Sequence, residues 1–268
     1  MSPSHPSNRR ADLVRLSRSA KAGVIGVGEA ASAWGKTRRE AALQLARLAR
    51  EGWLNRVRRG LYYIPALDAG EHVAVEDPWV LAAELFAPSY IGGWSAAEHW
   101  GLTEQLFRET FVVTAANIRR REQTALGSPF HLVKVPVERV KSVETVWRGS
   151  ARVRVSNPER TLVDCFMDPS WAGGVRHLAT MLSVYRDSPE ASPERLASEL
   201  IAVGTGAAHK RLGFVAEHVW PEATGLIEIA ANGRSAGVIR LDPAVGARGR
   251  MNRRWGLWVN ATLPSRDA

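Results

Sequence analysis

KTRREAALQLARLAREGWLNRVRRGLYYIP, residues 36–65 of this 268-residue chain, contains the clearest structural signals of the sequence. Its apolar residues recur three and four positions apart, at Ala41, Leu45 and Leu48. This period predicts a helix with one buried face. Thr37 and Glu40 have the T-x-x-E spacing of a capping box, which sets the helix start.

The segment that follows predicts a small basic hairpin. Gly52 is expected to end the helix, and short strands are expected at 53–57 and 61–64, on either side of the turn Arg58-Arg59-Gly60. A helix followed at once by such a hairpin is typical of the second half of a winged helix-turn-helix. Helices expected near 11–20 and 28–34 supply the first half. We therefore expect a disordered polar tail at 1–10 and a DNA-binding domain at 11–66.

The distribution of charge supports a polyanionic partner. Residues 1–66 contain thirteen Lys and Arg but four Asp and Glu, a net charge of +9. The whole chain is also +9, so residues 67–268 are neutral overall. A local excess of this kind is the electrostatic footprint of a nucleic-acid partner. The simpler alternative is a basic helix that is only solvated and binds no ligand. We favour DNA binding because the basic helix, the basic turn and the helix-turn-helix order occur together in one segment.

The residue types suggest how duplex DNA would be contacted. Arginine and glutamine side chains can read guanine and adenine edges in the major groove. Those in or beside the groove are expected to be Arg38, Arg39, Gln44, Arg47 and Arg50. At the helix N-terminus, Lys36 and Thr37 are expected to hold phosphate. The basic turn is expected to contact the DNA backbone or minor groove through Arg56, Arg58 and Arg59.

The rest of the chain predicts a larger second domain. A linker rich in Pro, Gly and acidic residues is expected at 67–76, and a mixed α/β domain at 77–268. Helices are expected at 78–86, 95–99, 159–167, 174–185, 192–203, 206–219 and 223–231. The first three are expected to be capped by Asp77, Ser95 and Asn157, and the fifth to start at Ser192. Strands are expected at 90–94, 110–114, 130–135, 143–147, 153–155, 237–241 and 255–259. The fold class is therefore α+β: an N-terminal winged helix-turn-helix and a larger mixed α/β C-terminal domain.

No motif for catalysis, metal binding or cofactor binding stands out, so a non-enzymatic protein without cofactor is expected. Asp164 and Asp168 are interpreted as solvated or salt-bridged carboxylates and Glu98-His99 as a packed helix end. Cys165, the single cysteine, is interpreted as a buried apolar residue; it excludes an internal disulfide and suits a reducing cytoplasm. No run of about 18 apolar residues occurs, so neither a membrane span nor a membrane partner is expected.

Arg160 follows the sequence Asn157-Pro158-Glu159, which is typical of a helix start. An arginine at this position can join the helix to the neighbouring hairpin through a carboxylate or backbone carbonyls. We favour this structural role over ligand binding.

Three segments resemble the AbiEi family, the antitoxins of type IV toxin–antitoxin systems. They are ARLAREGWLNRVRRGLYYIP (46–65), YIGGWSAAEHWGLT (90–103) and VSNPERTLVDCF (155–166). The resemblance spans roughly residues 13–185, and the Pro-Glu-Arg-Thr-Leu block is its most specific part. At Glu98-His99-Trp100 this chain departs from the small or aliphatic residue usual in the family, which leaves the partner of that surface open.

The resemblance implies an autorepressor that binds inverted repeats in its own promoter. It also implies antitoxin activity of the second domain against a cognate nucleotidyltransferase-like toxin, with direct contact left open. Two other classes remain alternatives. One is a one-component winged-helix regulator whose C-terminal domain senses a small molecule, and the other is a nucleic-acid enzyme that uses the winged helix for targeting. A neighbouring metabolic gene would favour the first, and metal-dependent DNA cleavage the second.

Overall fold

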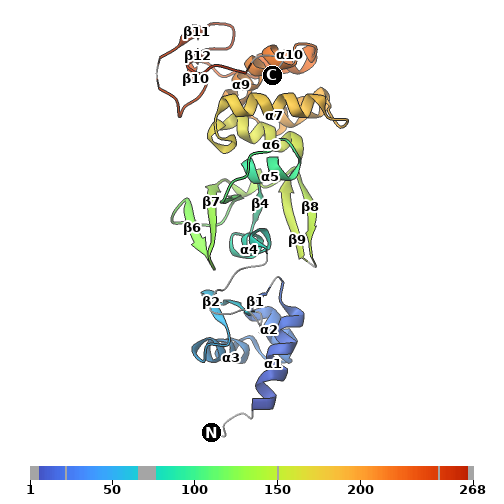
Figure 1. Cartoon of the computed structure of the whole chain (residues 1–268), viewed down its shortest axis with the longest axis vertical. Coiled ribbons are helices and arrows are strands. Elements are labelled where there is room, and N and C mark those ends of the chain that lie inside the picture. Colours follow the sequence, from blue (N-terminus) through green and yellow to red (C-terminus); the bar gives the residue numbers. More distant parts are fainter. Residues whose placement is uncertain (1–5, 22, 66–76, 150, 247, 265–268) are drawn as a thin grey trace.

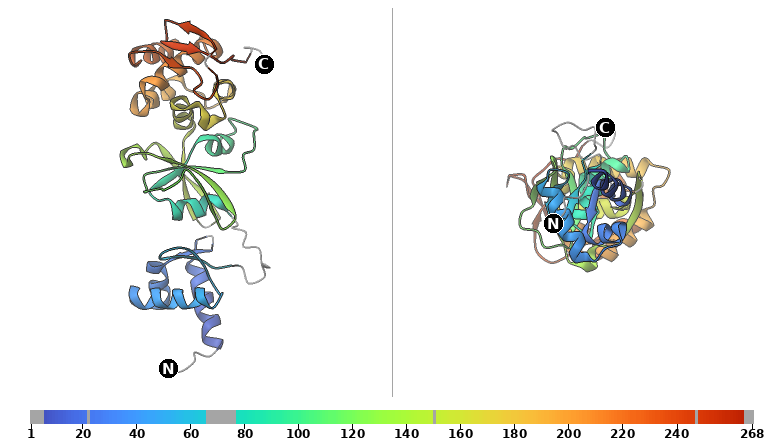
Figure 2. Two further views of the ribbon diagram at one scale, coloured as in Figure 1. Left: turned by 90° about the vertical axis from the view of Figure 1, so that its left-hand side faces the viewer. Right: turned by 90° about the horizontal axis from the view of Figure 1, so that it is seen from below.

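The computed structural model describes residues 6–21, 23–65, 77–149, 151–246 and 248–264, with side chains from residue 10 onward. Three parts follow one another along the long axis of the molecule (Figures 1 and 2). They are an N-terminal unit, a central sheet with helices, and a helical C-terminal part with a small sheet. The predicted linker at 67–76 lies outside the described residues.

The N-terminal unit has the element order of a winged helix-turn-helix. Its described elements are α1 (Pro6–Ser19), β1 (Val24–Gly26), α2 (Val27–Trp34), α3 (Arg38–Arg50), β2 (Asn55–Arg58) and β3 (Leu61–Tyr63). The strands pair antiparallel in the order β1-β3-β2, and the β2–β3 hairpin is the wing. The predicted fold class is confirmed, and α2, α3 and the wing lie within two residues of their expected bounds.

Two features of this unit differ from the prediction. Helix α1 begins at Pro6, so the part of the expected tail from Pro6 to Arg10 is helical. Proline suits the first helical position because its missing N–H has no partner there in any case. Strand β1 was not predicted. Three residues are too few to show an alternating pattern, and β1 exists because Val24–Gly26 pairs with β3 across the unit.

The expected helix cap is present at the start of α3. The Thr37 hydroxyl accepts a hydrogen bond from the Glu40 N–H, and Glu40 Oε2 accepts from the Thr37 N–H at 3.0 Å. Hydrogen bonds from the Thr37 hydroxyl and N–H lower the pKa of Glu40. The buried face of α3 packs into a core formed by Leu13, Leu16, Ile25, Ala30, Ala31, Trp34, Ala41, Leu45, Leu48, Leu54 and Tyr62.

The central part is a six-stranded mixed sheet with the order β6-β7-β5-β4-β9-β8. Its strands are β4 (Ser89–Ile91), β5 (Thr110–Thr114), β6 (Glu122–Ala125), β7 (Ser128–Lys134), β8 (Val143–Arg148) and β9 (Ala151–Ser156). Pairs β4–β9 and β5–β7 are parallel, and the other neighbours are antiparallel. Strand β6 was not predicted because EQTA has no apolar alternation, and only its pairing with β7 makes it a strand.

Three helices cover this sheet: α4 (Pro78–Leu85), α5 (Gly93–His99) and α6 (Pro158–Met167). Asp77 and Asn157 cap α4 and α6 as predicted. The expectation that Ser95 caps α5 is wrong. The helix starts at Gly93 with Gly92 as its cap, and the Ser95 hydroxyl instead accepts from the Phe111 N–H at 2.9 Å.

The N-terminal sheet packs against the central part. Val24, Leu61 and Tyr63 share one buried cluster with Trp79 of α4 and with the strands of the central sheet. Figure 1 shows β1 and β2 on the side of the N-terminal unit that faces α4. Polar contacts accompany this packing: Lys21 Nζ lies 3.4 Å from Glu84 Oε1 of α4. The charge of Glu84, with a contribution from Glu29, raises the pKa of Lys21.

The C-terminal part is mainly helical, as expected. It contains α7 (Val175–Asp187), α8 (Pro193–Val203), α9 (Gly206–Val219) and α10 (Thr224–Asn232). The short 3-10 helix Pro169–Ala172 joins α6 to α7, and a second one, Val137–Arg139, lies between β7 and β8 of the central part. Its sheet contains β10 (Ile239–Arg240), β11 (Arg250–Asn252) and β12 (Leu257–Val259). Strand β11 lies in the connection between the expected strands 237–241 and 255–259, where no strand was predicted. Trp255 is fully buried against α9, where any side chain at Gly213 would overlap its ring.

None of the helices in the described ranges is both long and apolar enough to cross a membrane.

Candidate nucleic-acid interface

Helix α3 presents one apolar and one basic face. Ala41, Leu45 and Leu48 are buried in the N-terminal core, which fixes the rotation of the helix about its axis. The opposite face is exposed and carries Arg39, Leu43, Arg47 and Arg50. An exposed basic face on the second helix of a helix-turn-helix is the geometry that places arginines against base edges in the major groove.

The contacts made by Arg47 and Arg50 leave both side chains available. Arg47 Nε lies 2.8 Å from Glu51 Oε1, one helical turn away, and the Arg47 side chain is half exposed. Arg50 Nε donates a long hydrogen bond to the Ala46 carbonyl at 3.4 Å. Exposed ion pairs contribute at most about 1 kcal/mol, so a phosphate or a base can replace such a contact at little cost.

The N-terminus of α3 is open to solvent. Lys36, Thr37 and Arg38 are all exposed there, and the Thr37 hydroxyl is already occupied by its cap. Lys36 and Arg38 line a broad depression of about 700 Å³ against α2, whose floor includes Gly28 and Gly35. Backbone N–H groups at such an end, together with two cations, suit a DNA phosphate.

Gln44 does not join the exposed arginines. It is half-buried, and its amide donates to Asp12 Oδ2 of α1 at 2.7 Å while its carbonyl accepts from Lys36 Nζ. Gln44 therefore lies between α1 and α3, away from the exposed face that was expected to read bases. Sequence spacing alone did not reveal this, because Asp12 lies 32 residues away.

The three arginines of the wing divide into two groups. Arg56 and Arg59 are exposed. Arg58 is exposed too, but its Nη2 donates to the Glu84 carbonyl of α4 at 3.1 Å. The pairing of β2 with β3 shifts register between Arg56 and Arg58, so these two arginines do not occupy equivalent positions in the hairpin. The structure thus places Arg58 at the junction with the central part.

Leu43 was overlooked as a candidate. It is 65% exposed on the basic face, four residues from both Arg39 and Arg47. The sequence alone could have indicated this residue, because a large apolar side chain lies there in the middle of a stripe of arginines. Apolar side chains in the major groove contact the thymine methyl group.

The groups considered for catalysis are placed as follows. Asp164 is fully buried and bonded to Arg160 and Tyr90, while Asp168 accepts hydrogen bonds from Ser170. Burial raises the pKa of the Cys165 thiol well above its ordinary value. Glu98 is exposed. Among the residues that the structure describes, no group of three or more His, Cys, Asp and Glu side chains is arranged to hold a metal ion.

Burial also affects His99, whose ring packs edge-on against Trp79 and Trp100. Partial burial, together with the charge of Arg148, lowers the pKa of His99. His99 is exposed at the end of α5, where its ring contacts these two tryptophans.

These elements define the class of the N-terminal unit: a winged helix-turn-helix whose helix α3 has an exposed basic face. Residues 12–65 match the family model AbiEi_4, described as "Transcriptional regulator, AbiEi antitoxin". The resemblance found in the sequence is therefore confirmed for the N-terminal unit.

The whole chain is also similar in fold to a solved structure, that of the RV2827C protein from Mycobacterium tuberculosis. The TM-score is 0.60 at 18% sequence identity, with 94% of this chain and 90% of that chain covered. This likeness shows that the order of the three parts recurs in another protein. None of the curated proteins compared matches this chain.

Proposed function

We propose that this chain is a non-enzymatic, DNA-binding transcriptional autorepressor and the antitoxin of a type IV system. The observation that carries DNA binding is the exposed arginine face of α3 on a unit that holds the entire net charge of the chain. The match of residues 12–65 to AbiEi antitoxin regulators supports a role in transcription.

In the proposed complex, α3 lies in the major groove with Arg39, Arg47 and Arg50 toward the base edges. Lys36 and Arg38 hold phosphate at the helix N-terminus, and Arg56 and Arg59 of the wing contact the backbone or the minor groove. Gln44 and Arg58 act as positioning residues, the first through α1 and the second through α4. Two copies on inverted repeats supply the affinity that one unit lacks.

A titration of the full-length protein against the DNA upstream of its own gene tests the regulator role. We expect preference for this fragment over random DNA of equal length, with log K falling steeply with log salt. The slope changes by about 0.9 for each phosphate neutralised. Equal binding to both DNAs at every salt concentration would remove the operator assignment and leave only non-specific attraction.

The antitoxin role is proposed from the family resemblance, with the second domain as its carrier. Co-expression with the product of an adjacent nucleotidyltransferase-like gene tests it. We expect growth to be restored by the wild type and also by a variant whose DNA binding has been removed through α3. Continued growth arrest with well-folded wild-type protein would exclude this antitoxin role.

Leu43 provides a test of the orientation of α3. We expect that replacing one operator thymine by deoxyuridine, which removes only the 5-methyl group, weakens wild-type binding several-fold. The Leu43→Ala variant should bind both DNAs equally, because it has lost the partner of that methyl group. Binding is measured by fluorescence anisotropy on a series of singly substituted operators, with Val14→Ala on α1 as the matched control. A wild-type protein indifferent to every such substitution contradicts the proposed orientation.

A further inference from the structure

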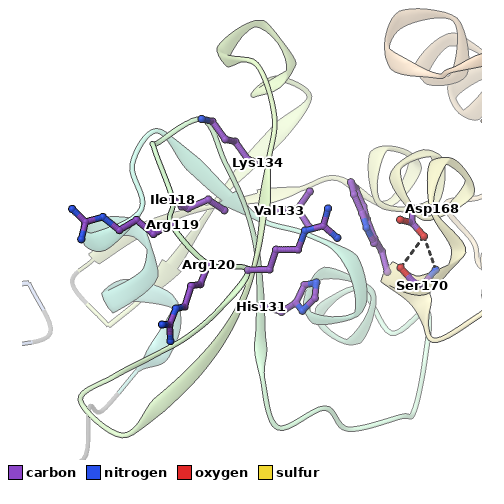
Figure 3. Close-up of a pocket in the computed structure, with 10 residues that line it drawn as sticks. Ile118, Arg119, Arg120, His131, Val133, Lys134, Asp168 and Ser170 are labelled. Atoms are coloured by element: carbon purple, nitrogen blue, oxygen red, sulfur yellow. Dashed lines mark hydrogen bonds between the residues drawn. The ribbon is translucent and has the colours of Figure 1, made fainter. Parts of the chain in front are cut away.

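The central part contains a cavity that the proposed function does not use. It has a volume of about 330 Å³ and lies between the loop 115–121, strand β7 and the 3-10 helix Pro169–Ala172 (Figure 3). Its lining residues are Ile118, Arg119, Arg120, Arg121, His131, Val133, Lys134, Asp168, Ser170 and Trp171. Small-molecule sites in proteins begin at roughly this size, about 300 Å³.

The rim of the cavity is strongly cationic. Arg119, Arg120 and Arg121 are consecutive and exposed, and no ion pair to their guanidinium groups occurs among the described residues. Lys134 is exposed as well and donates to the Asn117 side chain at 3.2 Å. Arginine runs in sequence are usually solvated, but here the fold places beside this loop a lysine from strand β7 and a hollow. Residues 67–268 are neutral overall, so this cluster is a local concentration of charge.

Acidic groups do little to offset this charge. The lining carboxylate, Asp168, accepts hydrogen bonds from the Ser170 N–H at 3.1 Å and hydroxyl at 2.7 Å. Figure 3 shows Arg119 and Arg120 directed away from Asp168 and Ser170. Glu122 pairs with His131 in the β6–β7 ladder but does not line the cavity. The cations are therefore available to an anion that enters from solvent.

The inner wall of the cavity is aromatic. Trp171 is half-buried and packs against Phe111 at a centroid distance of 5.4 Å. The His131 ring stacks on the same Phe111 at 5.1 Å. This packing places the Trp171 ring, which belongs to the 3-10 helix Pro169–Ala172, against strand β5 of the central sheet. Aromatic rings beside cationic groups are the arrangement that proteins use for a base and its phosphates.

We propose that this cavity binds a free nucleotide. Phosphates lie against Arg119, Arg120, Arg121 and Lys134, which can form charge-assisted and bidentate hydrogen bonds to phosphate oxygens. The base packs against Trp171. The chemistry is that of a nucleoside triphosphate, because its three phosphates match a cluster of cations better than a single phosphate does. This site is independent of the α3 surface and does not rest on the proposed operator binding.

Isothermal titration of the full-length protein tests the site. The probes are ATP, GTP, CTP, UTP and inorganic triphosphate. We expect at least one nucleoside triphosphate to bind. The double variant Arg119→Ser/Arg120→Ser should bind it at least about tenfold more weakly, since each charge-assisted contact to phosphate is strong. The matched control, Arg240→Ser/Arg253→Ser, removes two exposed arginines from the C-terminal segment and should bind as the wild type does.

A second variant separates base from phosphate. Trp171→Leu should weaken binding of the nucleoside triphosphates and leave inorganic triphosphate unchanged. Thermal melting of each variant confirms that it is folded. Failure of every probe to bind the wild type overturns the proposal, as does an equal loss in the control variant. If Arg119→Ser/Arg120→Ser instead weakens duplex DNA and no free nucleotide binds, the cavity belongs to the DNA interface and the nucleotide assignment is wrong.

Discussion

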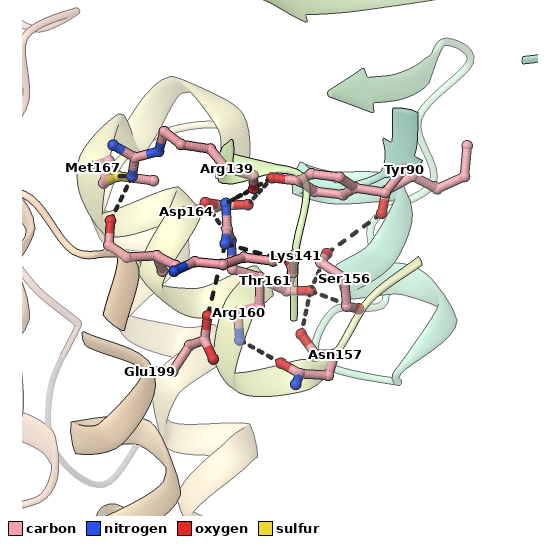
Figure 4. A network of polar contacts seen from close by, with 12 residues as sticks. Tyr90, Arg139, Lys141, Ser156, Asn157, Arg160, Thr161, Asp164, Met167 and Glu199 are labelled. Carbon is pink, nitrogen blue, oxygen red and sulfur yellow. Dashed lines mark hydrogen bonds and ion pairs between the residues drawn. The ribbon is translucent and has the colours of Figure 1, made fainter. Parts of the chain in front are cut away.

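Replacing Arg160 with Met is expected to lower the free energy of unfolding by about 3–5 kcal/mol, the usual cost of leaving a buried charge without its partner. Arg160 and Asp164 are fully buried in α6, with Arg160 Nε 2.9 Å from Asp164 Oδ1. Arg160 also donates to the Tyr90 hydroxyl and the Arg139 carbonyl, both at 3.0 Å (Figure 4). Burial alone would lower the pKa of Arg160, but Asp164, Tyr90 and Glu199 together outweigh it and the pKa is raised.

The deficit of Arg160→Met, meaning its loss of unfolding free energy relative to the wild type, should depend on pH. Burial raises the pKa of Asp164, and without Arg160 this pKa rises further. The folded variant then binds a proton that the unfolded chain does not bind at the same pH. The deficit is therefore largest above the folded-state pKa of Asp164 and shrinks as the pH falls through that pKa toward the lower pKa of the unfolded chain. Urea unfolding between pH 5 and pH 8, read by circular dichroism, measures both effects.

Two further variants complete this experiment. Arg160→Met/Asp164→Leu removes both charges and should recover much of the lost stability. Arg176→Met replaces an exposed arginine on α7 and should change the free energy of unfolding by at most about 0.5 kcal/mol. A small deficit for Arg160→Met, or no recovery in the double variant, would show that the buried pair is not what holds α6 to the sheet.

Replacing Arg39 and Arg47 together by Ala is expected to weaken operator binding by two orders of magnitude or more. Each good contact between arginine and a base discriminates by about 1–3 kcal/mol. Both side chains lie on the exposed face of α3, and each is about one helical turn from Leu43, which lies between them. The ratio of the affinity for operator to the affinity for random DNA should also fall in this variant, because contacts to base edges carry the sequence preference.

The matched control is Arg15→Ala/Arg18→Ala, which removes the same charge from exposed positions on α1. We expect this control to weaken operator and random DNA by similar factors and to keep the preference between them. Competition binding with both DNAs at fixed salt gives the two ratios. If the α1 variant loses the preference and the α3 variant keeps it, the assignment of α3 to the major groove is wrong.

Local signals in the sequence were sufficient for much of the fold. The caps Thr37, Asp77, Asn157 and Ser192 start helices where predicted, because each satisfies backbone N–H groups of its own first turn. The buried face of α3 followed from its apolar period alone. The structural role preferred for Arg160 is confirmed, although its partners Tyr90 and Arg139 were not named.

What the sequence determined by itself is therefore the class of the N-terminal unit, its charge and the exposed face of α3, since periodicity, caps and charge are all properties of neighbouring residues. Tertiary structure alone decided the rest. Strands β1, β6 and β11 exist only because a partner strand lies beside them. Gln44 is hydrogen-bonded to Asp12 of α1, and Arg58 is hydrogen-bonded to the Glu84 carbonyl of α4. Trp171 lines the same cavity as the loop Arg119–Arg121, although about fifty residues of sequence separate them. These contacts depend on how distant segments pack, which no local pattern encodes.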